Sequence, residues 1–174
     1  NENPEVELNV KTGFSQKVYQ MALNSEVHAG IIRGDYQWLG PKYLLCEEPY
    51  YLASAEPIDM ENLPNFPRIH YKTDSPLQAE LDTWWYSHYN KPPFIAMEVD
   101  TVDTCIQMVS KGLGYALLSG ICLKNLKPFQ KAKLTYKDGH TLQRKTWLYY
   151  RESTLKIRSV KAFVEFLRSY DSLS

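Results

Sequence analysis

The stretch DTVDTCIQMVSKGLGYALLS, residues 100–119, predicts a helix followed directly by a strand, and this pair sets the fold class. Its first half places apolar residues at helical spacing: Val102, Cys105, Ile106 and Val109. Asp100 is a residue type that caps a helix, and Gly112 is typical of a helix end. The apolar run at residues 115–118 then predicts a buried strand.

The same alternation of strands and helices continues on both sides of this stretch. Residues 5–12 alternate apolar and polar side chains and predict a strand, Ser15 is expected to cap a short helix, and residues 30–32 predict a second strand parallel to the first. Further along, the pattern predicts a long extended segment at 43–55 and a helix at 75–85 that is capped by Ser75. It then predicts a strand at 144–151 and a last helix at 160–167.

These elements predict an α/β chain in two lobes. Residues 1–46 and 140–174 are expected to form the first lobe, which is therefore discontinuous, and residues 47–139 the second. The two crossings, near 47–50 and 135–141, would form a hinge with a cleft between the lobes.

Composition narrows the class of protein. The 174 residues carry 20 Lys+Arg and 20 Asp+Glu, so the net charge is zero, whereas a chain that grips nucleic acid by itself usually has a basic excess. The 3 cysteines are widely spaced, which argues against a disulfide framework and favours a reducing cytosol. No run approaches the roughly 18 apolar residues of a membrane span, so we expect no membrane partner.

The stretch HAGIIRGDYQW, residues 28–38, raises the question of what Arg33 binds. Arg33 follows an apolar run, and a guanidinium there stays charged and needs an anion. Either Asp35 or another side chain supplies that anion, or a ligand does. Arg144 begins the strand that returns to the same lobe, and is either a second ligand group or a solvated strand end.

Two hydroxyl residues complete the candidate ligand site. Ser15 and Thr101 each stand at the start of a predicted helix, where they could bind a ligand or only cap the helix. The expected ligand residues are Arg33, Arg144, Ser15 and Thr101.

Catalysis and metal binding have no support in the sequence. The 4 histidines lack ligand spacing, so we expect neither a metal nor a cofactor. No nucleophile motif occurs, and each cysteine lies among apolar residues. We therefore expect no catalytic residues and no enzyme activity.

Three segments in the right order resemble the effector-binding domain of LysR-type transcriptional regulators. The first resembles the opening of that domain and the second its helix, Gly-x-Gly and strand, with Ser119 in place of the usual proline; the third resembles its closing strand and helix. The segments are PEVELNVKTGFSQKVYQMALNSEVHAGIIRG, EVDTVDTCIQMVSKGLGYALLSG, and WLYYR with SVKAFVEFLRS.

The resemblance implies a type 2 periplasmic-binding-protein-like α/β fold, with two lobes, a hinge and an interlobe cleft for a small effector. Against that pattern, the chain is expected to lack the first strand and first helix of the domain, and the N-terminal helix-turn-helix through which the family binds DNA. The chain resembles the citrate-responsive catabolite control branch at Ser15, Arg33 and Arg144, which implies a small carboxylate effector, with citrate favoured.

The resemblance also implies that the chain self-associates through the effector domain. It further implies that the whole protein is a cytoplasmic bacterial regulator. The alternative is a solute-binding protein of a transport system, which would share the fold.

Overall fold

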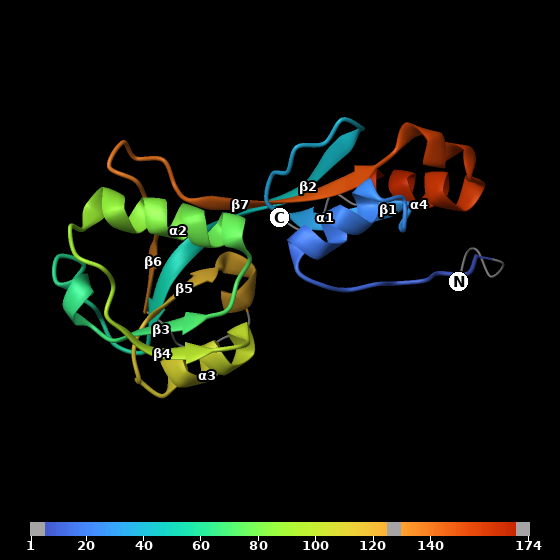
Figure 1. Cartoon of the computed structure of the whole chain (residues 1–174). Coiled ribbons are helices and arrows are strands. Elements are labelled where there is room, and N and C mark those ends of the chain that lie inside the picture. The colour runs from blue at the N-terminus through green and yellow to red at the C-terminus, as the bar shows by residue number, and fades with distance from the viewer. Residues whose placement is uncertain (1–5, 125–129, 170–174) are drawn as a thin grey trace. The chain divides into compact units, whose positions relative to one another are not determined.

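The computed structural model describes residues 6–124 and 130–169, and the chain divides into two compact units (Figure 1). The first unit comprises Asn1–Glu47 and Lys145–Ser174, and the second comprises Glu48–Arg144. The chain passes between them within two strands, β2 (Lys42–Ser54) and β7 (Gln143–Tyr150).

The first unit is built on a short antiparallel sheet. Strand β1 (Ala29–Arg33) pairs with β7, so that Ala29 lies opposite Tyr150 and Arg33 opposite Thr146, and β7 pairs in turn with β2. Helix α1 (Ser15–Leu23) packs against β1.

Helix α4 (Arg158–Ser169) supplies the core of the first unit. Val160 and Val164 recur at helical spacing and pack on Leu148 and Tyr150 of β7, whose alternation presents both of these side chains to one face. The short 3₁₀ segment Glu152–Lys156 connects β7 to this helix.

The second unit is a sheet extended from β2. Strands β5 (Ala116–Ser119) and β6 (Gln130–Lys133) both pair with β2 antiparallel. Strand β3 (Arg68–Tyr71) pairs parallel with β4 (Ile95–Val99), and a single parallel bridge between Arg68 and Tyr115 joins β3 to the segment of β5. Two 3₁₀ turns, Leu63–Asn65 and Gly120–Leu123, lie in the connections.

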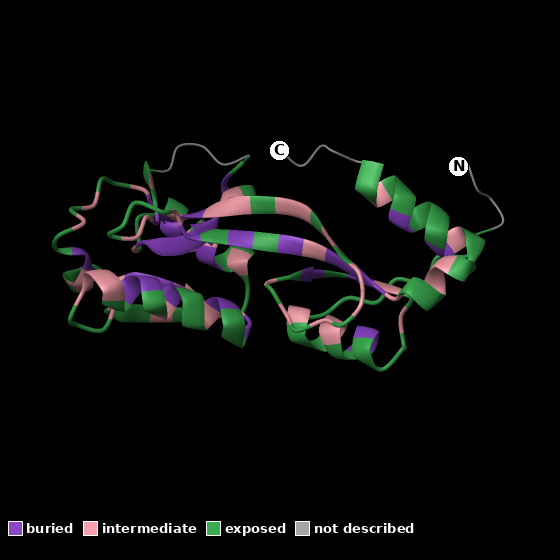
Figure 2. Cartoon of the chain, turned by 90° about the horizontal axis from the view of Figure 1, so that it is seen from above, coloured by how far each residue is buried: buried purple, intermediate pink, exposed green. Residues whose placement is uncertain are grey.

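Two helices cover opposite faces of this sheet, with α2 (Ser75–His88) on one side and α3 (Val102–Ser110) on the other (Figure 1). All of β5 is buried because successive side chains point to opposite faces: Leu117 joins the core under α2, and Ala116 and Leu118 join the core under α3. Figure 2 shows how burial varies along the chain, with buried residues in purple and exposed residues in green.

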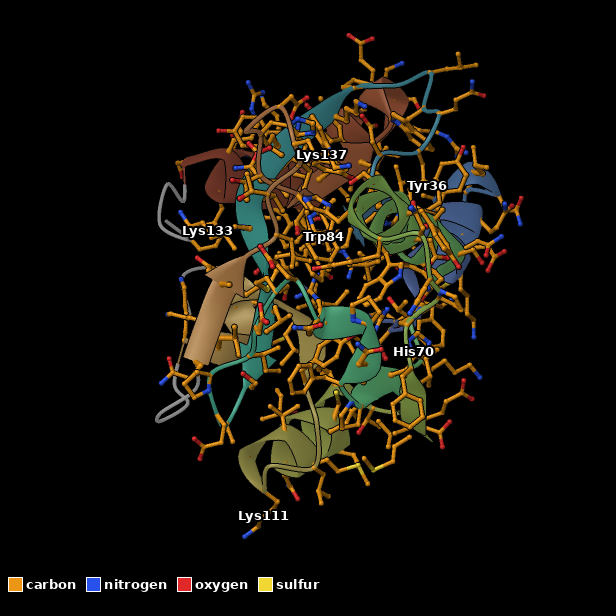
Figure 3. All side chains as sticks on the ribbon, turned by 90° about the vertical axis from the view of Figure 1, so that its left-hand side faces the viewer. Tyr36, His70, Trp84, Lys111, Lys133 and Lys137 are labelled. Atoms are coloured by element: carbon orange, nitrogen blue, oxygen red, sulfur yellow. The ribbon has the colours of Figure 1, made fainter. Side chains whose placement is uncertain are left out.

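Several sequence expectations are confirmed. The helix within residues 100–112, the strand that follows it and the long extended segment at 43–55 correspond to α3, β5 and β2. Both Trp84 and Trp85 are buried, and Trp84 lies in the interior while Lys111 points outward (Figure 3). Strand β6 was not predicted, because its sequence QKAK has no apolar alternation.

The predicted strand over residues 5–12 is wrong for the residues described. Residues 6–14 form neither helix nor strand and are exposed, and residue 5 lies outside the described residues. A strand needs a neighbour to take its backbone hydrogen bonds, and none of the described strands pairs with this segment. The predicted parallel pair of this segment with residues 30–32 is also wrong, since residues 6–12 form no strand and β1 pairs with β7 instead.

The predicted helix caps are each wrong by one residue. Asp74 caps α2 and Thr101 caps α3 through side-chain hydrogen bonds, while Phe14 stands at the cap position of α1 without one. Asp74 and Thr101 have the extended backbone that a cap requires. The residues predicted as caps were Ser15, Ser75 and Asp100.

Candidate functional site

Ser15 and Arg33, predicted from separate parts of the sequence, lie side by side in the first unit. Ser15 is the first residue of α1 and Arg33 the last residue of β1, and the Arg33 backbone N–H donates to Ser15 Oγ at 3.3 Å. The free N–H groups at the start of α1 therefore lie next to the end of β1.

The Arg33 guanidinium pairs with no carboxylate among the described residues. Its side chain is exposed, and it makes no ion pair with any residue that the structure describes. Asp35, the anion that the sequence offered as an alternative, instead binds Lys42 Nζ at 2.5 Å. The alternative of an Arg33–Asp35 pair is thus wrong, and the guanidinium remains available to an anion from outside.

Arg144, in the second unit, has the opposite setting. It is 8% exposed, its Nη2 donates to Asp74 Oδ2 at 2.8 Å, and its Nη1 donates to the Tyr50 hydroxyl at 3.1 Å. Burial raises the pKa of Tyr50, so its oxygen accepts this bond as a neutral hydroxyl. The alternative of a solvated strand end is therefore wrong for Arg144.

Asp74 links this ion pair to the start of α2. One carboxylate oxygen, Oδ1, accepts from the Leu77 backbone N–H at 3.1 Å, and the other binds Arg144. Asp74 is 9% exposed, so both interactions are shielded from water. The sequence analysis missed this residue, although an aspartate two positions before Pro76 is a recognisable cap signal.

Thr101 holds the start of α3. Its Oγ1 accepts from the Thr104 backbone N–H at 3.2 Å and lies 2.9 Å from the Thr104 hydroxyl. The hydroxyl is exposed, so it can also meet a ligand. The structure thus brings Ser15 and Arg33 together and gives Arg144 and Thr101 separate sets of partners.

Other chemistries find little support at the described positions. Burial raises the pKa of Cys105 to about 12, which keeps its thiol protonated and a poor nucleophile. Within residues 6–124 and 130–169, no group of three or more His, Cys, Asp or Glu side chains is placed to hold a metal ion. None of the helices in the same residues is long and apolar enough to span a membrane.

Comparison with known proteins assigns the family. The model of the LysR substrate binding domain matches residues 1–172. The chain is 39% identical over 165 residues to the uncharacterized HTH-type transcriptional regulator YraN of Bacillus subtilis strain 168, and 32% identical over 167 residues to YkuM of the same organism. Each alignment covers 95% of this chain and 57% of the relative, so the chain spans a little over half of their length.

A solved structure agrees with the family assignment at the level of the fold. The regulatory domain of CcmR from Synechocystis PCC6803, in complex with 2-PG, superimposes with a TM-score of 0.78 at 14% identity, over 99% of this chain and 86% of that one. The chain belongs to the LysR substrate-binding-domain family and has its two-lobe, periplasmic-binding-protein-like α/β fold. It is an effector-binding regulatory domain of a LysR-type transcriptional regulator.

Proposed function

We propose that this domain senses a small carboxylate effector, with citrate as the favoured ligand. The observation that carries the proposal is the exposed Arg33 side chain, free of ion pairs among the described residues, on a residue whose backbone N–H donates to Ser15 Oγ at the start of α1. A planar guanidinium matches a carboxylate with two parallel hydrogen bonds, and helix N–H groups favour the same charge. The complex of the CcmR regulatory domain with 2-PG supports a small ligand for this fold.

Arg144 and Thr101 are proposed as the ligand contacts of the second unit. Arg144 uses two of its nitrogens for Tyr50 and Asp74, and the remaining N–H groups of the guanidinium can take a further acceptor. Since Asp74 already compensates its charge, Arg144 would bind with less electrostatic gain than Arg33. We therefore expect Arg33 to contribute more of the affinity.

The whole protein is proposed to be a cytoplasmic transcription regulator that binds DNA through a region outside this chain. Both curated relatives are HTH-type transcriptional regulators of which this chain covers 57%. The chain itself has zero net charge, so we expect no DNA affinity from it. The transport alternative is not favoured, because both relatives are regulators.

A second copy of the chain is the proposed protein partner. Phe94 and Ile95, at the start of β4, are 54% and 42% exposed, and Phe66 is 36% exposed. Exposed apolar side chains at a strand edge are suited to an interface. Ile95→Lys should lower the sedimentation coefficient toward that of a monomer, and an unchanged coefficient of a stable dimer would rule out this surface.

The ligand proposal is tested by calorimetry with citrate on the wild-type chain, Arg33→Ala and Arg158→Ala. Arg158 is the matched control, an exposed arginine in the same unit at the start of α4. Arg33→Ala should weaken citrate binding by about tenfold or more, and Arg158→Ala should leave it unchanged. Equal affinity in all three proteins would refute the assignment of Arg33.

A further inference from the structure

The first unit contains a pocket that neither the family assignment nor the proposed effector site accounts for. It has a volume of about 1090 Å³ and lies between α1 and the connection from β1 to β2. Ser15 and Arg33 are not among its lining residues. We call it the aromatic pocket and define it by Tyr19, Leu23, Tyr36, Trp38, Lys42 and Arg151.

The walls of the aromatic pocket are stacked rings. Tyr19 of α1 stacks on Tyr36 with 4.7 Å between ring centroids, and Trp38 meets Tyr149 edge to face at 5.6 Å. Aromatic side chains give large, flat contact areas that favour another ring in an offset or edge-on arrangement. The volume lies just above the range typical of small-molecule sites, about 300–1,000 Å³.

The connection that carries these rings is fixed in place by hydrogen bonds. The Tyr36 backbone N–H donates to the Tyr149 hydroxyl at 3.0 Å, and Trp38 Nε1 donates to the carbonyls of Pro41 and Tyr150 at 3.1 and 3.2 Å. A Cβ at Gly40 would lie 2.6 Å from Trp38 Nε1, so only glycine permits this close approach. The indole donor is satisfied by the protein, which leaves the ring surface for a ligand.

The charges around the pocket favour an acidic ligand. Lys42 is neutralised by Asp35. Arg151 donates to Ser25 Oγ and to the carbonyls of Ala22 and Leu23 at the end of α1, and forms no ion pair with a carboxylate among the described residues. Its guanidinium also lies 6.0 Å from the Trp38 ring. Asp35 and Lys42, which both line the pocket, pair with each other, so the Arg151 charge is left without a carboxylate partner among the described residues and disfavours a cationic ligand.

We propose that the aromatic pocket binds a planar aromatic or heteroaromatic ring that carries one acidic group. The ring packs against Tyr19 and Trp38, and the acidic group lies toward Arg151. This site is separate from the Ser15–Arg33 site and takes a different class of ligand, because aromatic rings form part of its walls.

The probe is indole-3-acetate, and its binding to the 174-residue chain is followed by ligand-observed NMR. The variants are Leu23→Glu and Leu23→Lys, because Leu23 lines the pocket yet is 41% exposed, so that changing it leaves the core intact. Ile157→Glu is the matched control, since Ile157 is 43% exposed in the same unit and does not line the pocket.

Leu23→Glu should weaken binding by about fivefold through repulsion of the acidic group, and Leu23→Lys should bind as tightly as wild type or more tightly. Ile157→Glu should have wild-type affinity, and a citrate excess should not displace the probe. Absence of saturable binding up to about 10 mM would overturn the proposal. Equal affinities of the two Leu23 variants would also overturn it, as would a loss in Arg33→Ala as large as in Leu23→Glu, which would move the probe to the Ser15–Arg33 site.

Discussion

In the first unit, Arg33 is exposed at the end of β1, its backbone N–H donates to the Ser15 hydroxyl, and its guanidinium pairs with no carboxylate among the described residues. In the second unit, the guanidinium of Arg144 is buried between Asp74 and Tyr50. The same residue type thus provides an uncompensated charge in one place and a compensated charge in the other. Whether an arginine near a strand end is a ligand candidate therefore depends on which side chains of the protein already bind its guanidinium.

The largest expected effect comes from removing the partner of the buried arginine. Asp74→Ala leaves the Arg144 charge buried and unpaired and also removes the cap of α2, so the free energy of unfolding should fall by about 3–5 kcal/mol. Urea unfolding followed by circular dichroism measures the loss.

The matched control for this experiment is Asp35→Ala. Asp35 also pairs with a cation, Lys42, but its side chain is 60% exposed, and such surface pairs contribute about 1 kcal/mol or less. A loss for Asp74→Ala no larger than for Asp35→Ala would contradict the contrast between the buried and the exposed charges.

A smaller effect separates the two candidate hydroxyls. Thr101 caps α3, so Thr101→Ala should lower the free energy of unfolding by about 1 kcal/mol. Ser15 forms no cap bond, and the bond that its Oγ accepts from the Arg33 N–H is long and exposed, so Ser15→Ala should change the free energy of unfolding by less than about 0.5 kcal/mol. The reverse order in urea unfolding would show that the cap positions are misassigned.

The smallest effect concerns pH and compares a half-buried histidine with an exposed one. Burial, and next the nearby Arg68 charge, lower the pKa of His70 from its ordinary value of 6.5. The unfolded chain then binds more protons at this site than the folded chain as the pH falls below about 6.5. The stability contributed by neutral His70 is complete above that pH and is lost as the pH falls through the folded pKa.

His70→Gln should therefore reduce the fall in unfolding midpoint between about pH 7.5 and 5.5, measured by thermal unfolding at several pH values. His140→Gln, at an exposed position, is the control. An identical pH dependence in wild type and His70→Gln would show that protonation of His70 does not contribute to the loss of stability at low pH.

The sequence predicts the parts of the fold that depend on local pattern. The apolar spacing of Cys105 and Val109 identifies α3, and the apolar run after Gly112 identifies β5. The alternation at residues 6–12 also predicts a strand, but no strand forms there, because the pattern alone does not supply a neighbouring strand to pair with. The caps shift by one residue because several adjacent polar residues can fill the same role, as at Asp100 and Thr101.

The candidate site is only partly readable from the sequence. Ser15 and Arg33 are recognisable from their chemistry, and their proximity follows from a helix start that lies next to a strand end. The Arg144–Asp74 pair joins residues far apart in the chain, and no local pattern marks it. The aromatic pocket likewise depends on how Tyr36 and Trp38 cross over Tyr149, which becomes visible only in the folded chain.

The most direct test of the account measures stability and binding together, by urea unfolding of the wild-type chain and of Arg33→Ala with and without citrate. A ligand that binds only the folded state raises the unfolding midpoint. Citrate should raise the midpoint of the wild type, whereas Arg33→Ala should have the wild-type midpoint without citrate and a smaller increase than the wild type at the same citrate concentration. An Arg33→Ala protein that is stabilised by citrate as much as the wild type, or is markedly less stable without it, would contradict the claim that Arg33 provides the free charge for the effector.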